Sequence, residues 1–403
     1  MGQALWLAER GLGRTTPNPS VGALVIAAGG VVVGHGSTEP AGGRHAEIVA
    51  LDAAGARANG STLYCTLEPC AHTGRTGPCV DRIIAAGVRR VVAAVEDPDP
   101  RVRGGGFARL RAAGLDVSVG AGRREAVRLN LPFFTVHLEG RPMVVAKTAT
   151  SLDGRVASEP GRRTSLTSPP ALRRAQFTRA RMDAVAVGSA TLLVDDPRLD
   201  VRDLYRERPL VRAVFDRRLR TPPSARLLST CGAGPVVVLT SDAAARRSPA
   251  AVEALTGAGA TVLTEPEPSV TGFLRRLLAF DVQSVFLEGG PALQAAAFHE
   301  GVVDIVQAWV APVWLGEAGV PGADALLRAL PALSEARVEM HGPDALIEGY
   351  VHRIAGRPRR GRGPCADGGR EPVPGDVRPC AGAGPRRERC GQWRLPDGDL
   401  RRP

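Results

Sequence analysis

The sequence has almost no lysine and few aromatic residues. Lys147 is the single lysine among 52 basic residues, and aromatic residues make up 4% of the 403 positions. A composition so skewed toward arginine indicates coding bias, so the number of arginines says little about phosphate binding. The lysine is more informative, because its compact charge and adaptable pKa suit a crowded reactive site that arginine does not. The alternative is a residue without function at the edge of a strand.

Long apolar runs and secretory features are also missing. No run approaches the ~20 apolar residues of a membrane-spanning helix, and no charged segment followed by an apolar core marks a secretory signal. Seven cysteines, two of them in a metal-type arrangement, suit a reducing compartment better than a disulfide framework. We therefore expect a cytoplasmic protein without a membrane partner.

The net charge of +11 arises largely near the C-terminus. Residues 356–403 carry 12 arginines and 6 acidic residues and therefore contribute +6. They are rich in glycine and proline and lack apolar periodicity, so they cannot bury a core. We expect a disordered, non-catalytic extension. The alternative is a basic arm that binds nucleic acid.

The length and the predicted elements indicate two α/β domains. A chain of 403 residues is too long for one ordinary core. Within residues 1–140, helices are expected at 4–10, 45–56, 78–86 and 107–113, and strands at 21–27, 31–34, 61–66, 88–95 and 115–119. Such alternation predicts a layered α/β domain. After a linker near residues 139–142, strands are expected at 143–148, 183–187 and 284–287, the last followed by a helix to about residue 298.

The first half contains residues typical of a zinc site. One imidazole and two thiolates, from His45, Cys70 and Cys79, can hold zinc tetrahedrally and leave the fourth position open for water. Glu47 is not needed as a ligand and is free to move protons. The expected helix starts near these residues favour thiolates. The alternative is a structural zinc site, for which His72 and Cys65 are the nearby candidates for a fourth ligand.

This constellation resembles the zinc deaminases of the cytidine-deaminase type. Between the cysteines, the run Cys-x-His-x-Gly-Arg-Thr-x-Pro-Cys resembles the deaminase half of the bifunctional riboflavin-biosynthesis deaminase/reductase family. Residues 16–22 (Thr-Pro-Asn-Pro-Ser-Val-Gly) resemble the substrate loop of that family. The resemblance extends over about residues 1–355. It implies a cytidine-deaminase-like α/β/α layered domain over residues 1–140 and a dihydrofolate-reductase-like α/β domain over residues 142–355.

For the first half, the resemblance implies hydrolytic deamination of a pyrimidine. Zinc would activate a water for attack on the amino-bearing carbon, and Glu47 would carry the protons. Asn18 and His72 would contact the substrate. Taken alone, Asn18 is also consistent with a turn residue and His72 with a surface histidine. The chain departs from the family at Thr38, where a histidine is usual.

For the second half, the resemblance implies an NADPH-dependent reductase. It rests on the Ser-Leu-Asp-Gly run at 151–154, the block at 187–202 and the Glu-Gly-Gly-Pro turn at 288–291. A glycine turn before a helix can bind a pyrophosphate, although alone it is a weak signal. The implied substrate contacts are Arg179, Leu199, Arg202 and Glu288. Lys147 is added as a substrate contact because it is the single lysine and lies on the strand expected to enter the same cleft. The implied NADPH contacts are Ala149, Thr191, Asp195, Gly290, Pro291, Ala292, Leu293, Gln294, Ala295 and Ala296.

Three departures make the reductase half harder to assign. Arg163 and Ser165 replace the usual serine and tryptophan, and Val313 stands where a lysine is common. Loss of a stacking ring removes ~1 kcal/mol or more of cofactor contact. The leading hypothesis is a bifunctional deaminase and reductase acting on phosphoribosylaminopyrimidines, either as a monomer or as a homo-oligomer. The alternatives are a deaminase with a weakened or scaffold-only reductase half, and a nucleic-acid-associated deaminase that uses the basic extension.

Overall fold

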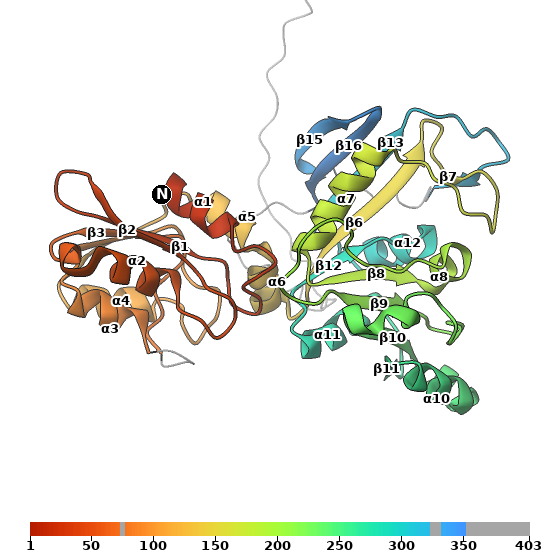
Figure 1. Ribbon diagram of the computed structural model, residues 1–403, viewed down its shortest axis with the longest axis horizontal. Coiled ribbons are helices and arrows are strands. Elements are labelled where there is room, and N and C mark those ends of the chain that lie inside the picture. The colour runs from red at the N-terminus through yellow and green to blue at the C-terminus, as the bar shows by residue number, and fades with distance from the viewer. Residues whose placement is uncertain (73–76, 323–331, 352–403) are drawn as a thin grey trace, which may run out of the picture. The chain divides into compact units, whose positions relative to one another are not determined.

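The computed structural model describes residues 1–72, 77–322 and 332–351 (Figure 1). The extension expected at 356–403 lies outside these residues. Residues 1–356 form one compact unit that contains a five-stranded and a nine-stranded sheet. None of the helices in the described ranges is long and apolar enough to cross a membrane.

The first sheet has the strand order β2-β1-β3-β4-β5. β1 is antiparallel to β2 and β3, whereas β3, β4 and β5 are parallel to one another. The strands are β1 Gly22–Ile26, β2 Val32–Ser37, β3 Thr62–Cys65, β4 Arg90–Ala93 and β5 Asp116–Val119. The helices are α1 Gly2–Glu9, α2 Ala46–Ala54, α3 Cys79–Ala85, α4 Gly105–Ala112, α5 Arg123–Leu129 and α6 Leu131–Glu139, with a 3₁₀ turn at Gly55–Ala58.

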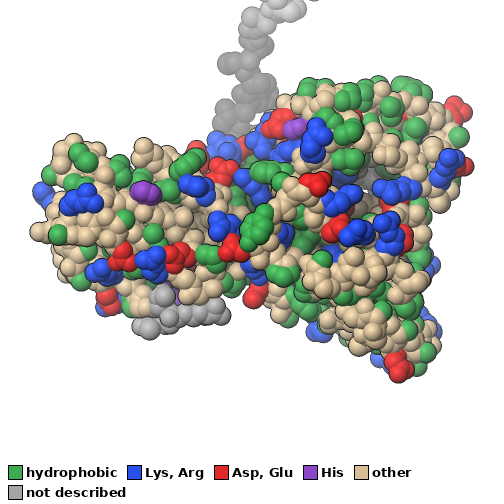
Figure 2. All heavy atoms as spheres, viewed as in Figure 1, with side chains coloured by type: hydrophobic (Ala, Val, Ile, Leu, Met, Phe, Trp, Pro, Cys, Tyr) green, Lys and Arg blue, Asp and Glu red, His purple; other side chains and the backbone are tan. Residues whose placement is uncertain are grey.

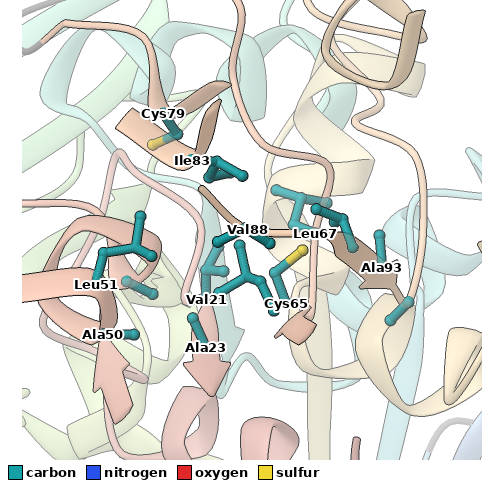
Figure 3. Packing of buried hydrophobic residues seen from close by; sticks show 14 of the residues in the cluster. Val21, Ala23, Ala50, Leu51, Cys65, Leu67, Cys79, Ile83, Val88 and Ala93 are labelled. Atoms are coloured by element: carbon teal, nitrogen blue, oxygen red, sulfur yellow. The ribbon is translucent and has the colours of Figure 1, made fainter. Parts of the chain in front are cut away.

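Alternating side chains of these strands face two layers of helices. Leu24 of β1 packs with α1 on one face of the sheet, and Ala23 and Val25 join the core that includes residues of α2, α3 and α4. This is the alternation expected of a strand buried on both faces. Cys65 lies among the packed side chains of that core, apart from Cys79 (Figure 3). The layered α/β/α arrangement predicted from the sequence is confirmed.

Glycine allows α2 to lie directly against β2. A Cβ atom at Gly34 would lie 2.1 Å from the Ala50 carbonyl oxygen, and one at Gly36 would lie 2.6 Å from that of Ala46. Any other residue at these positions would push α2 away from the sheet. The first turn of α2 carries Glu47, so this close packing helps to place a predicted catalytic residue.

The second sheet has the order β11-β10-β9-β8-β12-β6-β13-β16-β15. The strands from β11 to β13 are parallel, and β16 and β15 are added antiparallel. The strands are β6 Met143–Ser151, β8 Ala184–Gly188, β9 Val211–Phe215, β10 Val236–Ser241, β11 Ala260–Glu265, β12 Ser284–Leu287, β13 Ile305–Ala311, β15 Ser334–His341 and β16 Asp344–Tyr350. A separate ribbon pairs β7 Arg155–Ala157 with β14 Val320–Pro321.

Helices cover the parallel part of this sheet. They are α7 Pro169–Arg181, α8 Ser189–Asp195, α9 Asp242–Arg247, α10 Pro249–Gly257, α11 Val270–Leu277 and α12 Pro291–His299, with 3₁₀ turns at Leu228–Ala233 and Leu278–Phe280. Along β8, Ala184 and Ala186 belong to one apolar cluster and Val185 and Val187 to another. Burial on both faces explains why the sequences of such parallel strands are continuous apolar runs.

The expected elements appear with small shifts at their ends. The strand expected at 284–287 is reproduced, and the helix expected at 45–56 is α2 followed by a 3₁₀ turn. The linker region coincides with the end of α6, where Gly140 adopts a left-handed conformation with φ of 66°. Lys147 lies on β6, an inner strand of the sheet, where it pairs with Gln307 of β13 one position beyond the end of the pairing with β12.

Candidate active sites

The first cavity, of about 710 Å³, contains the predicted zinc ligands His45 and Cys70 in its wall. His45 precedes the first turn of α2, Cys70 follows β3, and Cys79 begins α3. The His45 Nδ1 atom lies 3.2 Å from the Cys79 Sγ atom and 3.6 Å from the Cys70 Sγ atom. The candidate ligand atoms of all three residues lie within 4.8 Å of one another.

This donor set fits zinc with one coordination position open. One imidazole nitrogen and two sulfurs are typical zinc ligands. Neither His72 nor Cys65 belongs to the group of possible ligands found in the described part of the chain. Cys65 is fully buried, and burial raises the pKa of its thiol well above the usual value. A structural site with four protein ligands is therefore disfavoured.

Hydrogen bonds shift the pKa values of the Cys70 and Cys79 thiols in opposite directions. Hydrogen bonds from the Cys79 and His45 side chains lower the pKa of the Cys70 thiol, against the effect of burial. The backbone N–H of Cys79 also donates to the Cys70 Sγ atom at 3.4 Å. The interaction with Cys70 raises the pKa of the Cys79 thiol. A thiolate is thus already stabilised at Cys70, which is the form that binds metal.

Glu47 lies beside these ligands on the cavity wall. Its side chain is only 4% exposed, and burial raises the pKa of its carboxyl group to about 7. A carboxyl group of this pKa can both accept and release a proton near neutral pH. It therefore has the properties that a general acid–base group needs.

Glu68 supports the segment that carries Cys70. Its buried carboxylate accepts N–H bonds from Gly104 and Gly106 at 2.9 Å each, and from Asp97 and Phe107 at 3.2 and 3.3 Å. Three of these donors lie at or beside the N-terminal end of α4, which favours negative charge. Glu68, which lies two residues before Cys70, thus ties the segment of that predicted zinc ligand to α4.

The remaining cavity wall contains both predicted and unpredicted residues. Asn18 and His72, the predicted substrate contacts, line it, and so does Thr38. The Thr38 hydroxyl accepts the Val21 N–H at 3.0 Å, so the residue at this departure from the family supports the backbone. The wall also contains four residues that no sequence motif indicated, namely Asp97, Asp99, Arg101 and His137.

The two missed aspartates have opposite electrostatic character. Burial raises the pKa of Asp97 to about 7, whereas hydrogen bonds from Arg101 lower the pKa of Asp99 to about 2. Both follow β4, which is parallel to β3. Because the carboxyl ends of parallel strands meet at one edge of a sheet, their position after a strand was a usable signal.

The second cavity, of about 630 Å³, lies over the parallel strands of the second sheet. Basic and acidic side chains gather on this face near α7 and α12 (Figure 2). The predicted residues that line it are Lys147, Ala149, Arg179, Thr191, Asp195, Leu199, Arg202, Glu288, Gly290, Pro291 and Gln294. Four others on α12 are not part of its wall, namely Ala292, Leu293, Ala295 and Ala296. Leu293 and Ala296 pack against the apolar core instead.

An ion pair organises the centre of this cavity. The Arg179 Nη2 atom lies 2.8 Å from each carboxylate oxygen of Glu288, and its Nη1 donates to the Asp200 carbonyl at 2.6 Å. Arg179 is 8% exposed, so the pair is held rigidly. Burial lowers the pKa of the nearby Lys147 ammonium, and the charge of Glu288 opposes this effect.

The turn before α12 is fixed to two neighbouring elements. The Gly290 N–H donates to the Thr191 hydroxyl at 3.0 Å. The Gln294 amide donates to the carbonyls of Lys147 and Leu287 at 3.0 and 3.1 Å. No side chain among the described residues caps the N-terminus of α12. The Gly290 N–H is therefore already bonded and Pro291 has none, so the N–H groups that a phosphate could reach at this end are those of Ala292 and Leu293.

Two of the three departures from the family pattern in this half lie in the wall of the cavity, and the third does not. Arg163 and Ser165 line it, whereas Val313 does not and is 41% exposed. Burial raises the pKa of the Asp195 carboxyl group, and the positive charge of Arg163 opposes this effect. Arg163 has no hydrogen-bond or ion-pair partner in the ranges that the structure describes. A free guanidinium and a missing aromatic ring thus change the cavity where the resemblance places the cofactor.

Comparisons with known proteins match both halves. The cytidine and deoxycytidylate deaminase zinc-binding region matches residues 1–95, and the RibD C-terminal domain matches residues 142–347. Riboflavin biosynthesis protein RibD of Aquifex aeolicus is 39% identical over 347 residues, covering 85% of this chain and 95% of the relative. RibD of Escherichia coli is 38% identical over 366 residues, covering 86% and 97%.

Solved structures of similar proteins agree over the same length. Acinetobacter baumannii RibD superposes with a TM-score of 0.78 at 33% identity, covering 87% of this chain and 97% of that chain. A diaminohydroxyphosphoribosylaminopyrimidine deaminase/5-amino-6-(5-phosphoribosylamino)uracil reductase from Thermotoga maritima has a TM-score of 0.76 at 31% identity, with the same coverage.

Proposed function

The chain belongs to the RibD family of riboflavin biosynthesis proteins, and on this premise we propose that it catalyses two successive steps of that biosynthesis. Residues 1–140 deaminate 2,5-diamino-6-(5-phosphoribosylamino)pyrimidin-4(3H)-one. Residues 142–355 then reduce the ribosyl group of 5-amino-6-(5-phosphoribosylamino)uracil to ribityl with NADPH. The proposed setting is the cytoplasm, with small molecules as the partners.

The observation that carries the deaminase assignment is the grouping of His45, Cys70 and Cys79 beside the buried Glu47. Zinc, when bound there, lowers the pKa of a water molecule toward about 7. Glu47 would take one proton from the attacking water and pass it to a ring nitrogen, and would then take the second proton from the new hydroxyl group and pass it to the departing amine. Water thereby replaces the amino group and ammonia is released. The neighbouring Asn18 contacts the pyrimidine.

The reductase assignment is supported by the ion pair in the second cavity. Arg179 and Glu288 hold each other and place a guanidinium and a carboxylate where they can bind a sugar phosphate and its hydroxyls. Lys147 adds a compact cation beside them. NADPH would supply the hydride, and Ala149, Thr191, Asp195 and the turn that contains Gly290 would hold it.

A second candidate function is a deaminase whose reductase half is weakened. Ser165 and Arg163 favour it, because both line the cavity proposed for NADPH and neither offers the ring that is usual in the family. A nucleic-acid-associated role would depend on residues 356–403, which lie outside the described ranges.

One incubation distinguishes these functions. Purified protein is mixed with the diaminopyrimidine ribotide, with and without NADPH, and the products are identified by mass. Deamination in both samples and reduction only with NADPH supports the bifunctional enzyme. Deamination alone supports the second candidate, and no deamination refutes both.

A further inference from the structure

The cavity of the deaminase site includes residues from far along the chain. Leu278, Asp281, Val282 and Gln283 line it together with Pro17 and Asn18. The four distant residues lie between α11 and β12, in the half that we assign to reduction. The cavity that holds the proposed zinc ligands is therefore completed by the second half of the same compact unit.

One hydrogen bond joins this segment to the substrate loop. The Gln283 side-chain amide donates to the Pro17 carbonyl at 2.8 Å, and Gln283 is 8% exposed. No other described residue donates to that carbonyl. Pro17 and Pro19 lack backbone N–H groups, and the Asn18 N–H donates to the Thr15 carbonyl at 2.9 Å within the loop. Among the described residues, Gln283 is the residue of the second half that forms a hydrogen bond to residues 16–19.

The hydrogen bond joins Gln283, whose backbone is fixed, to a loop that is anchored farther along the chain. Gln283 is fixed by its backbone, whose N–H donates to the Asp183 carboxylate at 3.1 Å and whose carbonyl accepts the Met143 N–H at 2.8 Å. The loop is anchored beyond Asn18 by Ser20, whose N–H donates to the Asn130 side chain at 2.7 Å. Between these anchors, the Asn18 side chain has no hydrogen-bond partner among the described residues. Its amide is left available to a ligand.

The two halves also lie close together upstream of the loop, where Gly13 approaches the end of α7. A Cβ atom at Gly13 would lie 3.1 Å from the Ala180 carbonyl oxygen and 3.2 Å from the Arg181 Cα atom. Gly13 has a φ of 77°, which favours glycine. The segment that leads into the substrate loop therefore also packs on the end of α7.

We propose that Gln283 is a positioning residue for deamination: it holds the loop of Pro17 and Asn18 so that the pyrimidine pocket is complete only when the reductase half is present. The proposal rests on the proposed deaminase function. Gln283 has no hydrogen bond to the zinc ligands or to Glu47 among those described above, so its effect is expected on substrate binding, through the loop of Pro17 and Asn18, and not on the metal. It lies before β12, whereas the cofactor turn follows that strand.

The test uses the full-length protein and two substitutions. Gln283→Met keeps the side-chain length and removes the donor, and Gln283→Glu places an acceptor opposite the Pro17 carbonyl. Loss of one such hydrogen bond is expected to raise KM for the diaminopyrimidine ribotide about 3- to 10-fold with Gln283→Met. The increase is expected to be greater with Gln283→Glu, because two acceptors then face each other. Zinc content, kcat for deamination and the reduction of pre-deaminated substrate are expected to stay at the parental level.

Gln3→Ala, on the exposed side of α1, is the matched control and is expected to behave like the parent. The proposal is overturned if both Gln283 variants have the parental KM, or if they lose zinc and both activities together. In the second case Gln283 is a general structural residue. A parent protein that does not deaminate refutes the proposed function instead, so the two failures are distinguishable.

Discussion

Replacing Glu68 by glutamine tests how the metal-binding loop is supported. The carboxylate accepts four backbone N–H groups, two on each oxygen. A glutamine retains one carbonyl oxygen and turns an NH₂ group toward the other two donors. Each lost bond to a charged group costs about 1.5–3 kcal/mol. We expect opening of the α4 N-terminus to become easier by about 3 kcal/mol, which corresponds to roughly 100-fold.

Amide hydrogen exchange of a peptide that covers residues 104–112 measures this opening. Its protection is expected to fall by roughly 100-fold in Glu68→Gln. Pro69 lies against this helix, because a Cβ atom at Gly106 would lie 2.0 Å from the Pro69 carbonyl oxygen. The displaced loop carries Cys70, so zinc affinity is expected to fall about 10- to 100-fold, as for other groups that orient ligands.

Glu96→Gln is the control, because Glu96 is an exposed glutamate close to the same network. It is expected to leave exchange and zinc affinity unchanged. Equal protection and equal zinc affinity in the two variants would refute the idea that Glu68 supports the site.

Other substitutions address each site separately. Cys70→Ser is expected to lose zinc and deamination together, measured as metal per chain and as ammonia release; full deamination after rigorous metal removal would contradict this. Glu47→Gln is expected to keep zinc while deamination slows by about 10²-fold or more, because proton transfer is lost. Lys147→Met is expected to impair only the reduction of pre-deaminated substrate, and a parental rate would remove it from the second site. Ser165→Trp is expected to tighten NADPH, measured as a lower dissociation constant, if the missing ring weakens cofactor binding; an unchanged constant would rule that out.

The candidate zinc site was accessible from the sequence because its chemistry is carried by short segments. His45 and Glu47 are two residues apart at one helix start, and Cys70 and Cys79 flank another. Their residue types and spacing restrict the chemistry before any fold is known. The alternation of strands and helices was equally readable, since it depends on local periodicity. Most residues of the second cavity were predicted only from the family resemblance, because isolated arginines are uninformative in so arginine-rich a chain.

Tertiary structure decided which residues meet across long separations. Gln283 reaches Pro17 across 266 positions, and Glu68 reaches the start of α4 across 36 to 39. No local pattern encodes such contacts, because they depend on how the sheets and helices pack. The same packing turned Leu293 toward the core and away from the cavity. The sequence by itself determined the chemistry of the zinc site and the α/β class, whereas packing determined which side chains support that chemistry.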